Sequence, residues 1–263
     1  MSFQPVVPAG GILGWGYLNA TMASQRQAFD SGRQITSDTA YFETKIAEIS
    51  TAEELVADRR LMRVALGAFG LQDDIDSRFL IRKVLEGGTA EPRALANRLS
   101  DARYKELTNA FGFAGPGAPG TRAKGFGAKI AAQYRDRAFE VAVGESDQSL
   151  RLAMNADREL SDLAAQDKGS DAGWFRILGT PPLRQVFETA LGLPKGFAQL
   201  DIDRQLAVFK ERATSRLGFE TISDLADADK RDAVIRRFLL QEQIGNIAVQ
   251  SPGAIALTLL QAR

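Results

Sequence analysis

Two stretches of the chain share one spacing of apolar residues, and both end in Gly-Leu. The first covers residues 61–71 and the second covers residues 183–193. Apolar residues at positions i, i+3, i+4 and i+7 form one face of a helix. In this chain they are Leu61, Val64, Ala65 and Ala68, and then Leu183, Val186, Phe187 and Ala190. We therefore expect an amphipathic helix in each stretch.

Each of these helices is expected to stop at its glycine, Gly70 or Gly192. A glycine in the left-handed conformation commonly ends a helix, and the apolar residue after it folds back onto the last turn. The pairs expected to touch are Leu71 with Leu66 and Leu193 with Phe187.

The residues that follow the two stretches also share an order. Each stretch is followed by closely spaced aspartates, a glycine break and a Leu-x-Asp-Ala tetrad, at residues 99–102 and 225–228. Self-similarity over this length suggests duplication of a helical unit rather than a short-period solenoid. We predict an all-α protein of two related multi-helix lobes, produced by an internal duplication, with no significant sheet.

The aspartates at 73–76 and 201–203 have two interpretations. A calcium loop needs D-x-D-x-D-G with a glutamate at its end, and neither copy has that run. Capping of the helices that follow needs only a carboxylate before the first turn. We expect caps, no metal site and no cofactor.

Glycine and proline suggest the division into domains. Residues 1–14 are expected to form a flexible N-terminal arm, and residues 114–124 a Gly/Pro linker. The first helical lobe would then cover residues 15–113 and the second residues 125–263. Trp15 would begin the first helix as a core anchor rather than as a ligand-stacking residue, because large aromatics mainly supply buried area.

Polar residues mark further helix boundaries in the first lobe. Ser31-Gly32 should interrupt the first helix, and Ser37-Asp38 should cap the second. Thr51, or Ser50 before it, should cap the helix that leads into the first Gly-Leu stop.

The linker also contains a candidate anion site. Gly115, Gly117 and Gly120 satisfy G-x-G-x-x-G, and Arg122 and Lys124 follow. A dinucleotide fingerprint needs a strand before it and a helix after it, whereas a helical pattern precedes this one. We interpret the segment as a linker. Small-ligand or phosphate binding by Arg122 and Lys124, at the next helix N-terminus, is the alternative function.

Composition removes most catalytic chemistries. The 263 residues include no His and no Cys, which excludes disulfides, thiolate nucleophiles, His-based triads and the usual zinc sites. The 33 basic and 33 acidic residues balance, which argues against a nucleic-acid partner. An enzyme would have to use carboxylates or lysine. The spacing of the acidic residues indicates no catalytic pair. We expect no enzymatic activity.

Hydropathy bears on location and on the C-terminal end. No run of eighteen apolar residues occurs, so no membrane-spanning helix is expected. The first residues lack the pattern of a secretory signal. The expected location is the cytoplasm, with export that uses no classical signal as the alternative. The mildly apolar residues 247–260 are expected to form a last helix or to bind a partner.

Several patches resemble, in order, the bacterial family catalogued as domain of unknown function 1217. They lie at residues 38–42, 58–61, 65–71, 79–86, 151–154 and 189–194. The resemblance covers the chain from Gly14 to Phe238, with Asn155 standing where an aromatic is expected. It implies an all-helical protein, often encoded among flagellar genes, with no established activity and no catalytic residues. We therefore expect a structural or assembly protein that acts through protein–protein contacts, with flagellar components as its partners.

Overall fold

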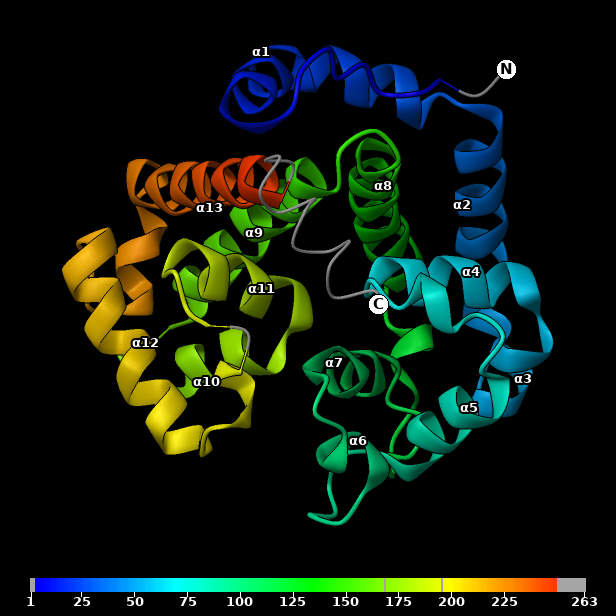
Figure 1. The fold of residues 1–263 in the computed structure, drawn as a ribbon. Coiled ribbons are helices and arrows are strands. Elements are labelled where there is room, and N and C mark those ends of the chain that lie inside the picture. The colour runs from blue at the N-terminus through cyan, green and yellow to red at the C-terminus, as the bar shows by residue number, and fades with distance from the viewer. Residues whose placement is uncertain (1–2, 168, 195, 250–263) are drawn as a thin grey trace, which may run out of the picture. The chain divides into compact units, whose positions relative to one another are not determined.

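The computed structural model describes residues 3–167, 169–194 and 196–249. The structure is 75% helical, and the part of the chain that it describes holds thirteen α-helices and no strand (Figure 1). The prediction of an all-α fold is confirmed. Residues 250–263, which carry most of the apolar tail, lie outside the described residues.

The chain forms two compact units, and one helix, α1 (Gly11–Asp30), contributes to both. Unit 1 comprises residues 1–6 and 21–143, and unit 2 comprises residues 7–20 and 144–263. The other helices of unit 1 are α2 (Arg33–Lys45), α3 (Ala52–Ala57), α4 (Arg59–Ala68), α5 (Arg78–Gly87), α6 (Leu95–Arg98), α7 (Ala102–Phe111) and α8 (Phe126–Gly144). Those of unit 2 are α9 (Gln148–Gln166), α10 (Ala172–Gly179), α11 (Pro181–Ala190), α12 (Ile202–Leu217) and α13 (Ala228–Val249).

This division differs from the boundary expected at residues 114–124, which lie within unit 1. The reason is the packing of the segment and of α8 behind it. Thr121 is buried, and its hydroxyl donates a hydrogen bond of 2.7 Å to the carbonyl of Ile49. Phe126 and Ile130 of α8 belong to the hydrophobic core of unit 1. The segment is therefore anchored to unit 1 by its own contacts.

The N-terminal end also differs from the expected arm, because α1 begins at Gly11 and not at Trp15. Trp15 is buried in unit 2, and its indole N–H donates to Asp232 at 2.9 Å. In unit 1, the side-chain amide of Gln25 bonds both the N–H and the carbonyl of Val6. Trp15 is thus a core residue, as expected.

The helices α4 and α11 end in the same hydrogen-bond pattern. Gly70 has φ of +72° and Gly192 has φ of +60°, both in the left-handed region. After α4, Leu71 N–H donates to the Leu66 carbonyl at 2.9 Å and Gly70 N–H to the Gly67 carbonyl at 3.1 Å. The equivalent bonds after α11 run from Leu193 to Glu188 at 2.9 Å and from Gly192 to Thr189 at 3.0 Å. These pairs form the Schellman arrangement of backbone bonds.

The order of elements after each stop is also the same. Each stop leads through a 3₁₀ turn to a helix, α5 or α12, that ends at a glycine with positive φ, Gly88 or Gly218. The aspartates of the two tetrads then accept from backbone N–H groups, Asp101 at 3.0 Å and Asp227 at 2.9 Å. Duplication of the whole lobe stays a prediction.

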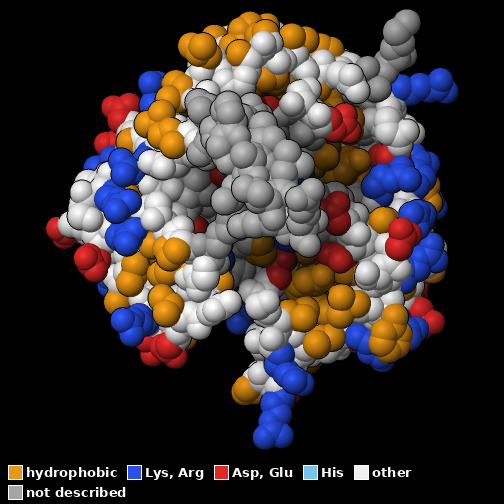
Figure 2. Space-filling model, viewed as in Figure 1, with side chains coloured by type: hydrophobic (Ala, Val, Ile, Leu, Met, Phe, Trp, Pro, Cys, Tyr) orange, Lys and Arg blue, Asp and Glu red, His pale blue; other side chains and the backbone are white. Residues whose placement is uncertain are grey.

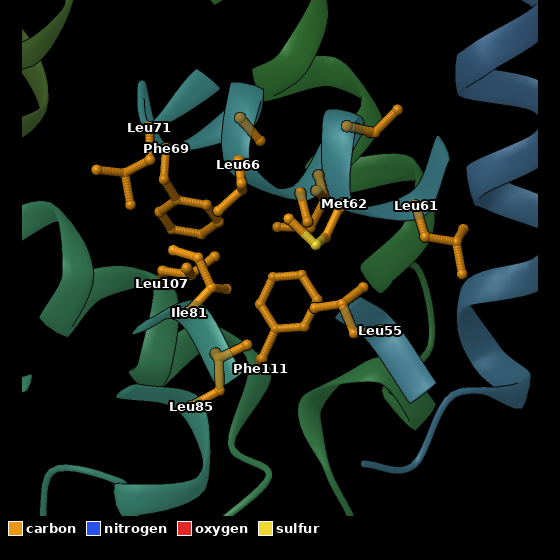
Figure 3. Packing of buried hydrophobic residues seen from close by; sticks show 14 of the residues in the cluster. Leu55, Leu61, Met62, Leu66, Phe69, Leu71, Ile81, Leu85, Leu107 and Phe111 are labelled. Carbon is orange, nitrogen blue, oxygen red and sulfur yellow. The ribbon is translucent and has the colours of Figure 1, made fainter. Parts of the chain in front are cut away.

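Each unit has its own apolar core. In unit 1, Phe111 packs edge-on to Phe126 at 5.2 Å between ring centroids, and Met62 and Ile81 lie beside it (Figure 3). The core of unit 2 also contains aromatic residues, and five rings there lie within 6.4 Å of a neighbour. They are Trp174, Phe187, Phe197, Phe209 and Phe219.

Two expected helix starts in unit 1 are wrong. The break at Ser31-Gly32 is confirmed, but α2 then begins at Arg33, so Asp38 lies inside the helix and not at its cap. Thr51 caps only the short α3, in a capping box with Glu54. Asp58 starts α4 by accepting from two backbone N–H groups at 2.8 and 3.1 Å. An N-cap side chain accepts from the unpaired N–H groups of the first helical turn. Tertiary contacts decide where each helix begins, and therefore which carboxylate lies next to such a turn.

Substitution of the two stop glycines by valine should destabilise the fold. A β-branched residue is strained in the left-handed region, so Gly70→Val and Gly192→Val should each lower the free energy of unfolding by about 1–2 kcal/mol. Gly117→Val is the matched control, because an added Cβ there meets no atom within 4 Å. Urea unfolding followed by circular dichroism measures the effect. Equal losses at all three sites would contradict this account of the stops.

Candidate functional site

Arg122 and Lys124, the candidate anion-binding residues, lie on the exposed turn before α8. The guanidinium of Arg122 donates to the Ser50 hydroxyl at 2.8 Å, and Lys124 is exposed. Gly120 lies so close to the Ala110 carbonyl that an added Cβ would stand 2.1 Å from it. The loop therefore follows a helix, α7, and packs on its end. It lacks the strand–loop–helix geometry of a dinucleotide site.

The most buried acidic side chain among the ion pairs of unit 1 is Asp38, which is 1% exposed. Its two carboxylate oxygens accept from Arg60 Nε at 3.2 Å and from Arg63 Nη1 at 3.1 Å. The amide of Gln34 donates to it at 2.6 Å. A buried carboxylate is stable when several charge-assisted hydrogen bonds replace its water. Asp38 thus joins α2 to α4.

A second set of contacts extends this junction. The guanidinium of Arg60 stacks on the Tyr41 ring at 4.2 Å, and the Tyr41 hydroxyl donates to Asp58 at 2.7 Å. The hydrogen bond to Asp58, followed by burial, raises the pKa of Tyr41. Burial acts to raise the pKa of Asp58, but bonds from Tyr41 and from backbone N–H groups outweigh it and hold that pKa below its ordinary value. The contacts among Arg60, Tyr41 and Asp58 stabilise the start of α4 and contain no reactive group.

Sequence reasoning missed the arginines that gather at the end of α11. Arg212 donates to the carbonyls of Leu191 and Gly192, both at 3.1 Å. Arg216 donates to Leu191 at 2.8 Å, and Arg237 donates to Ala190 at 2.9 Å. Cations are favoured at a helix C-terminus, where the last carbonyls lack partners. In unit 1, Arg103 donates to the Gly70 carbonyl. No local sequence signal links these arginines to the stops.

Two cavities in unit 2 are lined by both polar and apolar residues. The first, of about 320 Å³, is lined by Asp147, Ser149, Glu242, Gln243 and Asn246, among others. The second, of about 300 Å³, lies at the end of α9 and the start of α10 beside Asp167 and Arg176. Neither is lined by Arg122 or Lys124.

The carboxyl groups with shifted pKa values lie in neither cavity. Burial raises the pKa of Asp30, against the opposing charges of Arg135 and Arg26. The pKa of Asp224 lies well below its ordinary value, because Lys230 and the backbone N–H of Thr221 bond its carboxylate. Shifted acids in a cavity would indicate an active site. Here the pKa shift of Asp30 comes from burial, and that of Asp224 comes from its ion pair and its backbone bonds.

The aspartates considered as calcium ligands have structural partners. Asp74 accepts from the Tyr104 hydroxyl at 2.8 Å, and Asp76 pairs with Arg59 at 2.6 Å. The expectation that they cap α5 is wrong, because Ser77 holds that position without a side-chain bond. Asp201 does cap α12. Within the described ranges, no group of three acidic residues could hold a metal ion.

Comparison with known proteins identifies the family. A model of the family of proteins of unknown function DUF1217 matches residues 68–230, which is more than half of the chain. The chain belongs to this family. The match includes both Gly-Leu stops and both Leu-x-Asp-Ala tetrads of this DUF1217 protein. No functionally curated protein matches it.

A solved structure shares the fold of this DUF1217 chain. It is the X-ray crystal structure of protein AGR_C_984 from Agrobacterium tumefaciens, at a TM-score of 0.73 and 26% identity. The alignment covers 92% of this chain and 99% of that chain. Among the helices described, none combines the length and the apolar character needed to cross a membrane.

Loss of the Asp38 charge should destabilise unit 1. Asp38→Asn removes charge-assisted bonds to two arginines, and we expect a loss of about 1–3 kcal/mol in the free energy of unfolding. The matched control is Asp76→Asn, which breaks the exposed pair with Arg59 and should cost at most about 1 kcal/mol. Denaturant melts of both variants test this. A similar cost for the two would show that the junction of α2 and α4 does not depend on Asp38.

Acid should destabilise the protein partly through Asp224. Its pKa is depressed in the folded state, so its contribution is present above the unfolded pKa of about 4 and is lost as the pH falls below it. Asp224→Asn should therefore flatten the fall in melting temperature on acidification. Asp30→Asn should make that fall steeper, because the raised pKa of Asp30 favours the folded state at low pH. Calorimetric scans from neutral to acidic pH would refute this if the two variants changed the slope in the same direction.

Proposed function

We propose that this DUF1217 protein is a non-enzymatic structural or assembly protein that acts through contacts with other proteins. The proposal includes association with the flagellum, as the family resemblance implies. Its main support is the exposed apolar side of α1.

The first half of α1 is apolar on two opposite sides. Trp15 and Leu18 are buried in unit 2, whereas Leu13 is 79% exposed and Tyr17 is 40% exposed. Hydrophobic side chains gather at the surface over α1 (Figure 2). A helix that is apolar on all sides is normally covered on all sides. The exposed side is therefore a candidate contact surface.

Charge distribution supports the same interpretation. No Asp, Glu, Lys or Arg occurs before Arg26, so the exposed side of α1 from Gly11 to Gln25 is uncharged. The centre of a protein interface is depleted in charge and enriched in aromatic residues. Solvent-facing helices elsewhere in this chain carry charged side chains, as α5 and α12 do.

The remaining titratable chemistry supports a binding role over catalysis. His and Cys are missing from the sequence, and the carboxyl groups with shifted pKa values line neither cavity. A phosphate or another small anion, bound by Arg122 and Lys124, is the second candidate function. The observation that favours it is the position of both exposed cations beside the N-terminus of α8.

Deletion of the gene in its native host should reduce swimming or the number of filaments, since a contact protein is needed for an assembly. Arg122→Ala with Lys124→Ala should restore motility fully if the turn is not the working surface. Swimming assays and filament counts measure both. Unchanged motility after deletion, in a strain without a second copy, would remove the flagellar part of the proposal.

The α1 surface can be tested by a pair of charge insertions. Leu13→Glu should fail to restore motility, because it places a charge in the proposed contact surface. Asn19→Glu, an exposed site on the same helix, is the matched control and should restore it. Melting temperatures should stay close to wild type for both, since both positions are exposed. Full function of Leu13→Glu would rule out this surface.

A further inference from the structure

A second exposed apolar site lies at the beginning of α5 in unit 1. Phe79 is 69% exposed, and the Arg82 guanidinium and the Lys83 ammonium each lie 5.9 Å from the centroid of its ring. Arg78 is exposed beside it. Figure 2 shows basic and hydrophobic side chains side by side where α5 lies. We call these four residues the basic face.

The basic face keeps a positive balance. Glu86 pairs with Lys83 at 3.0 Å and with Arg82 at 3.6 Å, and Glu53 reaches Arg82 at 3.9 Å. Arg82 and Lys83 are thus paired with the exposed carboxylates of Glu53 and Glu86. Arg78 adds a third positive charge. Cations within about 6 Å of an aromatic ring are attracted to its face, so Phe79 and the cations beside it form one surface that combines an apolar group with positive charge.

The beginning of α12 in unit 2 has the opposite character. Leu200 is 39% exposed and Ile202 is 45% exposed, and they alternate with the exposed carboxylates of Asp201 and Asp203. Asp201 accepts from the Asp203 N–H at 2.9 Å, which holds the first turn in place. Arg204 follows and is exposed. We call residues 200–203 the acidic face.

The two faces occupy matching places, at the first helix after each Gly-Leu stop, and complement each other in charge. We propose that the protein binds a second copy of itself head to tail, with the basic face of one molecule on the acidic face of the next. Phe79 would lie against Leu200 and Ile202, and the cations around it would face Asp201 and Asp203. Complementary charge sets the register of such a contact more than its strength.

This contact joins two different surfaces, so it is heterologous. Heterologous contacts build rings or open chains, because a pair of molecules still has one unused basic face and one unused acidic face. The inference rests on the proposed function, in which the protein acts through protein contacts, and identifies the partner as a second copy of this chain. Three exposed apolar side chains cover much less than the ~1,600 Å² of a standard interface, so the association should be weak and should weaken further in salt.

Sedimentation velocity of the full chain, from micromolar to millimolar concentration, tests the proposal. The wild-type mass should rise with concentration beyond that of a dimer, and added salt should reverse the rise. Phe79→Ala alone, and Leu200→Ala with Ile202→Ala, should each stay monomeric. Ile244→Ala, an exposed apolar site on α13, is the matched control and should assemble as the wild type does. Equal circular dichroism spectra verify folding.

Mixing the two face variants is the decisive step. Each retains the face that the other lacks, so together they should form a dimer that does not grow. A wild-type mass that stays monomeric throughout, face variants that assemble like the wild type, or a mixture that stays monomeric would each overturn the proposal. None of these results depends on Leu13, so the α1 contact of the proposed function can fail or stand independently.

Discussion

The two left-handed glycines are the constraint on which the rest of this fold depends. A helix leaves its last carbonyls without partners, and the chain satisfies them at Gly70 and Gly192 with the same two backbone bonds. Arginines from later helices then bond the remaining carbonyls, Arg103 at the first stop and Arg212 at the second. Each stop turns the chain so that the helix after it packs back on the same unit. The stop is therefore both a local cap and a tertiary contact.

The carboxylates with the clearest contacts either cap a helix or hold two helices together. Asp101 and Asp227 cap the last helix of each repeated order, and Asp38 holds α2 against α4 through two arginines. Two acids, Asp147 and Glu242, line the first cavity, and Asp147 is bonded there by two backbone N–H groups as the cap of α9. The sequence contains no histidine and no cysteine. Further side chains, which have no part in these contacts, lie on the surface.

That surface differs between the units. α1 presents an uncharged apolar side, whereas the starts of α5 and α12 combine exposed apolar residues with opposite charges. Burial of an exposed Phe, Leu or Ile side chain contributes roughly 1.5–3 kcal/mol. Contacts with other chains would supply that burial.

The sequence alone determined the helical class and the two stops, because helical periodicity and a left-handed glycine involve only neighbouring residues. It could not place Asp38, whose burial exists only when α4 brings Arg60 and Arg63 to α2. Nor could it show that the glycine-rich segment at 114–124 belongs to unit 1, since Thr121 is anchored by the distant Ile49 carbonyl. Only tertiary packing determines which side of a helix finds a neighbour.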